Sequence, residues 1–191
     1  MKRGKLTLIT GGARSGKSSF AEKLAMQIGK QVIYVATAMV SDQEMEQRII
    51  KHRQQRPVCW QTVEEPLRVA EVIEEFGLQA PVILVDCLTV LLSNLTFEHA
   101  SYPEREQSDY MITNERQQEV LGYIETLAEK ARLSPAHVII VTNEVGQGVV
   151  PAFQLGRVYR DLAGWANQII ADRADEVYLV VAGIAVPIKQ A

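Results

Sequence analysis

The chain has 191 residues, of which 47% are hydrophobic and 23% are charged, which is ordinary for a water-soluble globular protein. This length allows one domain with a sizeable core, so we expect residues 1–191 to form a single domain. The formal net charge of −3 does not favour the binding of nucleic acid, and we expect no such partner.

The apolar segments of the chain are short. The run after the basic N-terminus covers only Leu6 to Thr10, whereas a signal peptide has an apolar region of about 7–15 residues. No stretch approaches the roughly 20 apolar residues that span a bilayer, so we expect a cytoplasmic protein without a membrane span. Cys59 and Cys87 form no metal-ligand spacing, and we expect two reduced thiols.

Strands and helices are predicted to alternate along the chain. The strand patterns are short apolar or β-branched runs, and the helix patterns are bounded by capping residues, glycine or proline. In chain order we expect a strand at 6–10, a helix at 17–29, a strand at 31–36, a helix at 41–55, a strand at 58–63, a helix at 66–76, a strand at 81–86, a helix at 88–96, a loop at 98–109, a helix at 110–133, a strand at 137–142, a helix at 153–173, and strands at 176–181 and 184–189. The alternation predicts an α/β fold with a mainly parallel sheet, helices on both faces and a C-terminal hairpin.

A phosphate-binding motif joins the first predicted strand to the first predicted helix. The pattern G-x-x-x-x-G-K-[ST] is matched by Gly11, Gly12, Ala13, Arg14, Ser15, Gly16, Lys17 and Ser18. Glycines let successive backbone N–H groups surround phosphate oxygens, and the helix N-terminus adds its positive dipole end. We expect Lys17 to reach the β- and γ-phosphates and the Ser18 hydroxyl to bind Mg²⁺. The motif predicts a P-loop NTPase fold that binds a nucleoside triphosphate.

An aspartate ends the apolar strand predicted at 81–86. In phosphate-loop proteins an acidic residue at such a strand end commonly serves the metal, directly or through water. Asp86 suits equally well the N-cap of the helix predicted at 88–96. The pattern alone leaves these two roles nearly even.

A histidine lies among basic residues on the helix predicted at 41–55. Met45 and Ile49 share a helical face with His52, which on the pattern alone favours a partly buried core histidine beside a solvated basic edge. The alternative is chemical, because a neutral imidazole is available near pH 7. It can attack an α-phosphate, form a covalent phosphoramidate and expel pyrophosphate, with the basic neighbours offsetting the developing charge.

Several other distinctive segments follow the phosphate motif along the chain. They are Tyr34-Val35-Ala36-Thr37-Ala38, Glu44-Met45, Arg48-Ile49, His52-Arg53, Arg56-Pro57 with Trp60, Val85-Asp86-Cys87-Leu88-Thr89, Val141-Thr142-Asn143-Glu144-Val145-Gly146, and Arg160-Asp161-Leu162-Ala163-Gly164 with Asn167-Gln168. Together with the phosphate motif, these segments resemble the bifunctional adenosylcobinamide kinase / adenosylcobinamide-phosphate guanylyltransferase family of cobalamin biosynthesis. The resemblance covers nearly the whole chain, from Leu6 to Lys189.

The resemblance implies two reactions. A nucleoside triphosphate, ATP or GTP, first phosphorylates the hydroxyl of the aminopropanol arm of adenosylcobinamide. GTP then donates GMP to adenosylcobinamide phosphate, giving adenosylcobinamide-GDP and pyrophosphate. The second reaction passes through a guanylylated histidine, which matches His52. Some relatives have a second histidine beside it, where this chain has Lys51.

The resemblance also implies site residues and partners. Lys17 and His52 would serve catalysis, and Ser18 and Asp86 would serve Mg²⁺. Guanine nucleotide would be contacted at Thr37, Ala38, Met39, Arg53, Gln54, Gln55 and Arg56. Glu64 matches an acidic position near nucleotide or metal, although it also suits a plain surface acid. The family further implies a homotrimer with the corrinoid near a subunit boundary.

Three matched residues receive no role from the resemblance. They are Asn143, Glu144 and Asp161. Asp161 also suits an ion pair with Arg157 or Arg160 on the same predicted helix.

Two other functions fit the phosphate motif. One is a small-molecule kinase without the nucleotidyl step. The other is a nucleotide-binding switch, which would require the guanine-selective motif Asn-Lys-x-Asp. The chain has only Thr142-Asn143-Glu144-Val145, without the lysine and the aspartate, which weakens the switch.

Overall fold

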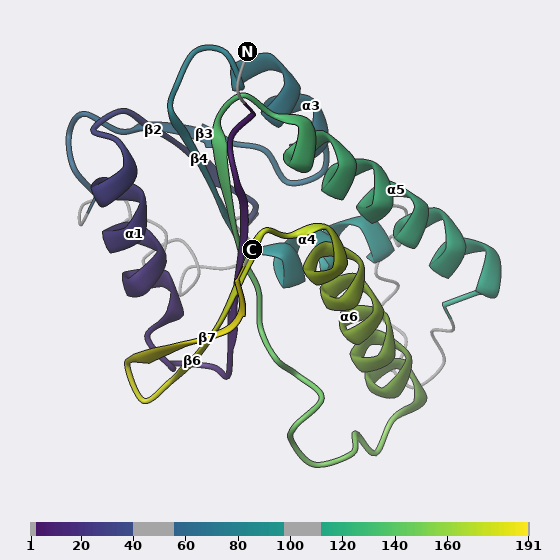
Figure 1. Cartoon of the computed structure of the whole chain (residues 1–191). Coiled ribbons are helices and arrows are strands. Elements are labelled where there is room, and N and C mark those ends of the chain that lie inside the picture. The colour runs from purple at the N-terminus through teal and green to yellow at the C-terminus, as the bar shows by residue number, and fades with distance from the viewer. Residues whose placement is uncertain (1–2, 40–55, 98–111, 191) are drawn as a thin grey trace.

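The computed structural model describes residues 3–39, 56–97 and 112–190, which contain a seven-stranded sheet with helices on both faces (Figure 1). The strands are β1 (Leu6–Gly11), β2 (Val32–Ala36), β3 (Gln61–Glu64), β4 (Val82–Asp86), β5 (His137–Val141), β6 (Glu176–Val181) and β7 (Ile184–Gln190). The helices are α1 (Lys17–Ile28), α3 (Val69–Phe76), α4 (Leu88–Phe97), α5 (Asn114–Leu133) and α6 (Gln154–Arg173). The helix predicted at 41–55 and the loop predicted at 98–109 lie outside the described residues.

The sheet is mainly parallel, as predicted. Its strand order is β3-β2-β4-β5-β1-β6-β7. Every pair is parallel except β6 with β7, which form the predicted C-terminal hairpin. The phosphate motif follows β1, which lies between β5 and β6, and Asp86 ends β4 on the far side of β5. The predicted α/β fold is confirmed.

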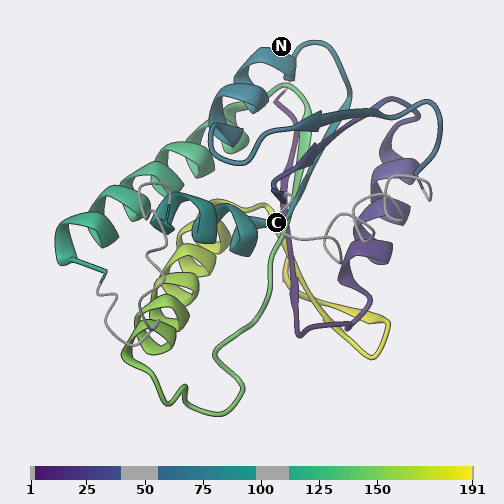
Figure 2. The same cartoon turned by 180° about the vertical axis from the view of Figure 1, so that it is seen from behind.

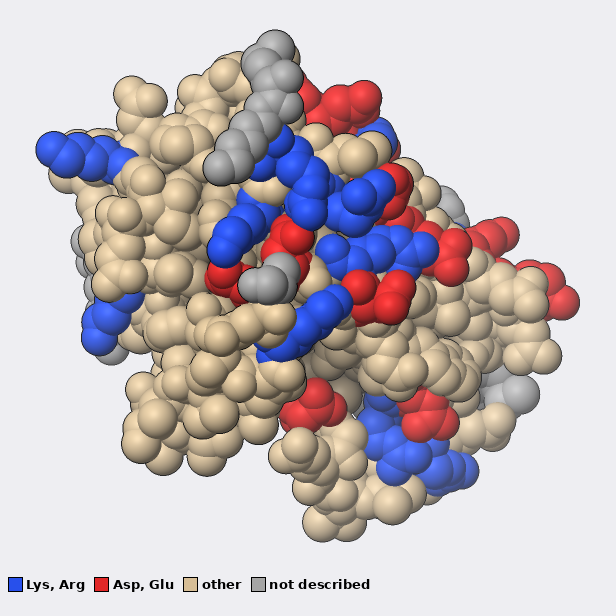
Figure 3. Space-filling view, viewed as in Figure 1, with Lys and Arg blue, Asp and Glu red and all other residues tan. Residues whose placement is uncertain are grey.

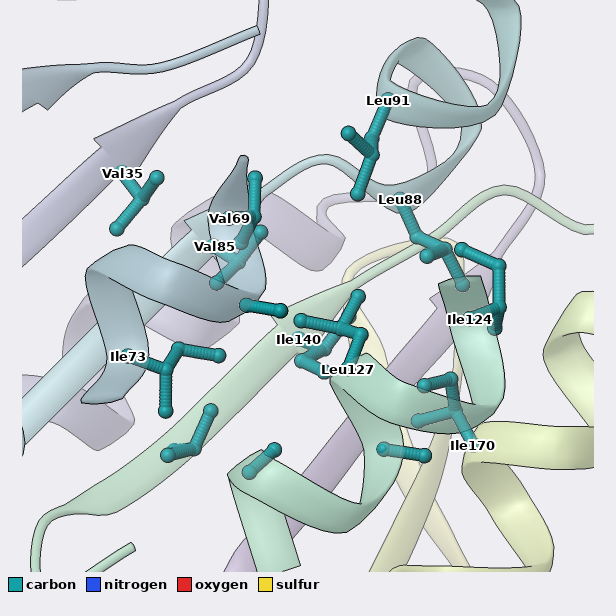
Figure 4. Close-up of a cluster of buried hydrophobic side chains, with 14 of the residues drawn as sticks. Val35, Val69, Ile73, Val85, Leu88, Leu91, Ile124, Leu127, Ile140 and Ile170 are labelled. Atoms are coloured by element: carbon teal, nitrogen blue, oxygen red, sulfur yellow. The ribbon is translucent and has the colours of Figure 1, made fainter. Parts of the chain in front are cut away.

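Alternate strand residues serve two hydrophobic cores, one on each face of the sheet. Leu6 and Leu8 belong to the larger core, which the sheet shares with α3, α4, α5 and α6 (Figure 4). Ile9 belongs to the smaller core under α1, which also holds Ala21 and Ala25 of that helix. Both views place α1 alone on its face and the other described helices together on the opposite face (Figure 2).

A side-chain cap explains where α5 begins. The Thr113 hydroxyl accepts a hydrogen bond from the Arg116 N–H at 3.2 Å, so α5 starts at Asn114 rather than at residue 110. Glu65 Oε1 accepts from the backbone N–H groups of Leu67 and Arg68 at 3.0 and 2.9 Å, just before α3. The Thr113 cap places the start of α5 four residues later than the sequence pattern does, and α3, whose N-cap Arg68 has no side-chain cap, starts three residues later than predicted.

The register brings the carboxyl ends of four strands together. Asp86 of β4 lies beside Ala36 of β2 and beside Val141 of β5, and Val141 lies beside Ile9 of β1. Because these strands are parallel, the segments that follow them emerge at one edge of the sheet. Ligands of open α/β sheets bind outside this carboxyl edge.

Asp175 fastens the start of β1 to the start of β6. Its carboxylate accepts two hydrogen bonds from the Arg3 guanidinium, at 2.6 and 2.9 Å, and one from the Leu6 N–H at 2.8 Å. These bonds, chiefly those from Arg3, lower the pKa of Asp175 to about 2. The ionised carboxylate therefore favours the folded state.

We expect Asp175→Asn to lower the free energy of unfolding by about 1–2 kcal/mol near neutral pH, a figure kept small because Arg3 is partly exposed. Since the folded pKa is depressed, the wild-type advantage should be complete above about pH 5 and should vanish as the pH falls towards about 2. Urea unfolding at several pH values measures this. Asp172→Asn, at an exposed position nearby, is the control. An unchanged gap between wild type and Asp175→Asn down to about pH 2.5 would contradict the assignment.

Candidate nucleotide-binding site

The phosphate motif forms a loop between β1 and α1, as predicted. Gly16 stands at the N-cap of α1 with φ 96° and ψ 5°, a left-handed conformation that favours glycine. A Cβ on Gly11 would lie 2.4 Å from the Val180 carbonyl oxygen and 2.7 Å from Ser15 Oγ. Both glycines of the motif are therefore required by the backbone itself, before any ligand is considered.

Lys17 lies folded back across the loop. It is the first residue of α1, and its Nζ donates to the Gly12 carbonyl at 3.0 Å. Only 8% of its surface is exposed. Burial lowers the pKa of its ammonium group, and the nearby Cys87 and Asp86 partly oppose this shift. The end of β4 and the residue after it are therefore close enough to Lys17 to affect its charge.

Neighbouring segments hold the loop from two sides. The Gly183 N–H, in the turn of the β6–β7 hairpin, donates to the Ser15 carbonyl at 2.8 Å. The Glu144 N–H, after β5, donates to the Gly11 carbonyl at 3.0 Å. Within the loop, the Ser15 N–H donates to the Gly12 carbonyl at 3.2 Å. The loop is thus fixed by hydrogen bonds to segments more than 120 residues later in the chain.

Asp86 is fixed through both its side chain and its backbone. The Tyr34 hydroxyl donates to Asp86 Oδ2 at 2.7 Å, and the Thr37 N–H donates to the Asp86 carbonyl at 3.3 Å. The first hydrogen bond of α4 is made to the residue after Asp86, since the Leu91 N–H donates to the Cys87 carbonyl at 3.1 Å. The carboxylate of Asp86 therefore accepts a hydrogen bond from a phenol rather than from a backbone N–H of α4. The structure does not show Asp86 as the cap of this helix.

The Thr37 side chain supports this same junction. Its Oγ1 accepts from the Cys87 N–H at 2.8 Å and donates to the Cys87 carbonyl at 2.9 Å, and Thr37 is fully buried. Its hydroxyl is therefore occupied by Cys87, the residue after β4, rather than open to a ligand. Of the predicted contacts after β2, Ala38 is half-buried and Met39 is exposed.

Arg56 turns inward onto β2. Its guanidinium carbon lies 3.4 Å from the centroid of the Tyr34 ring, and its Nη1 donates to Thr62 Oγ1 at 3.2 Å. Among the described residues, the buried Nε of Arg56 has no hydrogen-bond partner. Burial raises the pKa of Tyr34, with Asp86 adding to the shift and Arg56 opposing it. Arg56 thus contacts side chains of β2 and β3, Tyr34 and Thr62, in this structure.

The other predicted residues divide into placed and unplaced ones. Glu64 is exposed at the end of β3, two strands from β4 in the sheet. Asp161 pairs with Arg160 at 3.0 Å, as the ion-pair alternative proposed. His52, Arg53, Gln54 and Gln55 lie outside the described residues, so the structure does not place the predicted nucleophile.

A network of neutral polar groups joins β5, α4 and α6 behind the loop. Thr142 Oγ1 donates to Asn167 Oδ1 at 2.7 Å, and Asn167 Nδ2 donates to the Asn143 carbonyl at 3.1 Å. Asn143 Nδ2 in turn donates to Thr89 Oγ1 at 2.7 Å. The Tyr159 hydroxyl donates to the Thr89 carbonyl at 2.6 Å. These contacts give Asn143 a role in fixing the strand ends, which the motif alone did not reveal.

The donors at this edge suit a magnesium ion that is shared with nucleotide. Mg²⁺ prefers oxygen ligands and is commonly held by one or two protein groups together with substrate phosphates and water. Ser18 at the first turn of α1 and Asp86 at the end of β4 supply such oxygens. In the part of the chain that the structure describes, no group of three or more His, Cys, Asp or Glu residues forms a metal site. An all-protein cage is therefore not the kind of site found among these residues.

Nearly the full length of the chain matches one family. The model described as cobinamide kinase / cobinamide phosphate guanyltransferase covers residues 7–188. The chain belongs to this family. The expected resemblance is thereby confirmed, and the family accounts for the order of the motifs along the whole chain.

Two relatives illustrate the match. The bifunctional adenosylcobalamin biosynthesis protein CobU of Escherichia coli (strain K12) is 42% identical over 184 residues, which cover 96% of this chain and 99% of the relative. The bifunctional adenosylcobalamin biosynthesis protein CobP of Pseudomonas aeruginosa is 43% identical over 182 residues, with 95% and 96% covered. Among solved structures, a protein of Pyrococcus horikoshii OT3 is similar in fold alone, with a TM-score of 0.52, 8% identity, and 100% of this chain and 88% of that one covered.

We expect Gly16→Ala to weaken GTP binding by about tenfold or more and to lower stability by about 1–2 kcal/mol. Alanine disfavours the φ of 96°, and its Cβ would lie 3.1 Å from the Gly183 Cα. Calorimetric titration with GTP and urea unfolding measure the two effects. Gly122→Ala, at an open position of α5, is the matched control and should keep GTP affinity. Wild-type affinity in Gly16→Ala would contradict the role given to the loop backbone.

Proposed function

We propose that this chain carries out both reactions of its family. A nucleoside triphosphate phosphorylates the hydroxyl of adenosylcobinamide, and GTP then donates GMP to adenosylcobinamide phosphate with release of pyrophosphate. The observation that carries the proposal is the formed phosphate loop, with Lys17 buried across it, in a chain that matches the family from residue 7 to residue 188.

The kinase step uses the phosphate loop. The N–H groups of the loop and the start of α1 would hold the triphosphate, and Lys17 would exchange its bond to the Gly12 carbonyl for the β- and γ-phosphates. The oxygen of the acceptor hydroxyl attacks the γ-phosphorus, the bond from that phosphorus to the β–γ bridging oxygen breaks, and the hydroxyl proton passes to water. Ser18 and Asp86 would hold Mg²⁺, which offsets the charge on the phosphates.

The guanylyl step uses His52 as the nucleophile. One imidazole nitrogen attacks the α-phosphorus of GTP, and the bond to the pyrophosphate oxygen breaks. A phosphate oxygen of adenosylcobinamide phosphate then attacks the same phosphorus and releases the imidazole. Arg53, Gln54, Gln55 and Met39 belong to the proposed guanine-nucleotide contacts.

Several finer features accompany this proposal. ATP and GTP both serve as triphosphate substrates, and Mg²⁺ is the metal. The protein acts in the cytoplasm, where nucleoside triphosphates are available, and none of the described helices is long and apolar enough to cross a membrane. Charges of both signs are interspersed on the face in Figure 3, in keeping with a small-molecule substrate rather than nucleic acid.

The proposed assembly is a homotrimer. The outer strand β7 carries the exposed side chains of Ile184, Val186 and Ile188, which a subunit contact would cover. Exposed apolar side chains that gather on one strand are typical of such contacts.

Incubation with α-labelled GTP and a divalent metal tests the guanylyl step. We expect acid-labile, alkali-stable label on the wild-type protein and at least a hundredfold less label on His52→Ala, because the nucleophile is lost. His137→Asn is the matched control, since His137 bonds Thr7 at the opposite end of β5. Unlabelled wild-type protein that still phosphorylates adenosylcobinamide would point instead to a kinase without the nucleotidyl step.

Lys17→Ala tests whether one loop serves both reactions. We expect both kinase turnover and guanylylation to fall by about a hundredfold or more, because Lys17 would offset phosphate charge in each transition state. Lys23→Ala, at an exposed position of the same helix, should leave both rates unchanged. Retained kinase turnover in folded Lys17→Ala protein would overturn the shared use of the loop.

A further inference from the structure

Three side chains form a chain of contacts that ends on Asp86. The Arg56 guanidinium lies 3.4 Å above the Tyr34 ring, and the Tyr34 hydroxyl donates to Asp86 Oδ2 at 2.7 Å. Tyr34 is 2% exposed, so the phenol acts from within the protein. Among the described residues, Oδ1 of Asp86 has no hydrogen-bond partner. One oxygen of the carboxylate is thereby occupied and the other left for a ligand.

A phenol is a specific choice at this position. Phenylalanine would fill the smaller core under α1 about as well, since the Tyr34 ring already packs against Trp60 with centroids 6.3 Å apart. The hydroxyl adds one buried polar group, which costs free energy unless it is hydrogen-bonded. Its partner here is a carboxylate, which makes the bond stronger than one between neutral groups. The hydroxyl therefore acts on the orientation of Asp86 rather than on packing.

The Arg56 guanidinium places a positive charge over the face of the Tyr34 ring. A cation over an aromatic face is attracted by the negative face of the ring, and its charge makes the phenol a better donor. The arrangement leaves the buried Nε of Arg56 without a partner among the described residues. Buried unpaired donors are rare and call for an explanation. The stronger hydrogen bond from Tyr34 to Asp86 supplies one.

We propose that Tyr34 and Arg56 are positioning residues that fix the carboxylate of Asp86 so that it serves the metal–nucleotide complex through its single open oxygen, Oδ1. This inference rests on the proposed role of Asp86 in metal binding. Thr37 completes the arrangement, because it holds the backbone of Asp86 and Cys87 while Tyr34 holds the side chain. Tyr34 lies in β2 and Thr37 directly follows it, so this strand and the residue after it fix the acidic end of the neighbouring strand β4.

The test measures metal affinity rather than turnover. Mn²⁺ replaces Mg²⁺ as a paramagnetic probe, and its binding to protein saturated with a non-hydrolysable GTP analogue is followed by electron paramagnetic resonance. We expect Tyr34→Phe to weaken Mn²⁺ binding about tenfold, in line with the loss of one hydrogen bond to a charged group. Asp86→Asn should weaken it at least as much. Affinity for the analogue in EDTA should be unchanged in Tyr34→Phe, because the phosphate loop is intact.

Tyr123→Phe is the matched control. Its hydroxyl is also hydrogen-bonded to a carboxylate, since it accepts from the Ala70 N–H at 3.0 Å and donates to Glu71 at 3.2 Å, but this partly buried residue lies between α5 and α3. We expect wild-type Mn²⁺ affinity in this variant. The double variant Tyr34→Phe/Asp86→Asn should bind Mn²⁺ no more weakly than Asp86→Asn alone, because the phenol acts only through the carboxylate.

Arg56→Gln gives a second, independent readout. We expect a loss of about threefold in Mn²⁺ affinity, smaller than that of Tyr34→Phe. This variant decides the matter should Tyr34→Phe fail to fold. If Arg56 instead contacts guanine, Arg56→Gln will weaken the analogue in EDTA, and the positioning role of Arg56 is overturned.

The outcomes separate this inference from the proposed function. Wild-type Mn²⁺ affinity in Tyr34→Phe together with weak binding in Asp86→Asn overturns the positioning role alone. Additive losses in the double variant overturn it as well. Wild-type affinity in Asp86→Asn removes Asp86 from the metal site and the inference with it.

Discussion

The parallel register of four neighbouring strands is the constraint on which the site depends. It sets Ala36, Asp86, Val141 and Ile9 side by side in β2, β4, β5 and β1, so the segments after these strands meet at one edge. The phosphate loop, the acidic strand end and the segment after β5 come from three distant parts of the sequence. A shift of one residue in any pair would turn every side chain of that strand to the opposite face of the sheet.

Neutral hydrogen bonds, more than ion pairs, hold this edge in place. Thr37 joins β2 to β4, and Asn143 and Asn167 join β5 to α6, with each donor satisfied at 2.7–3.1 Å. Buried neutral groups in such a network lose little when all are paired, and they fix one arrangement of the backbone. Charged side chains are thereby left for the ligand: Lys17 from the loop and Asp86 from β4.

Local sequence patterns predicted the fold and the phosphate loop because their causes are local. The spacing of Gly11, Gly16 and Lys17 encodes a turn, a left-handed residue and a helix start within eight positions. The capping role of Asp86 could not be judged in this way, because the side chain that bonds its carboxylate is Tyr34, 52 residues earlier. Arg56 and Thr37 were predicted as nucleotide contacts from their motifs. Their inward-facing hydrogen bonds depend on which strands are neighbours, and no short pattern records this.

The contact between Gly183 and Ser15 determines how late in synthesis the phosphate loop can be completed. β1 is synthesised before the other described strands, yet its sheet neighbours β5 and β6 begin at residues 137 and 176. The nascent chain therefore carries an unpaired, largely apolar strand until β5 has been made, and the phosphate loop is held from both sides only once the hairpin turn has been made. Such long-range closure slows folding and leaves a strand edge open to wrong partners.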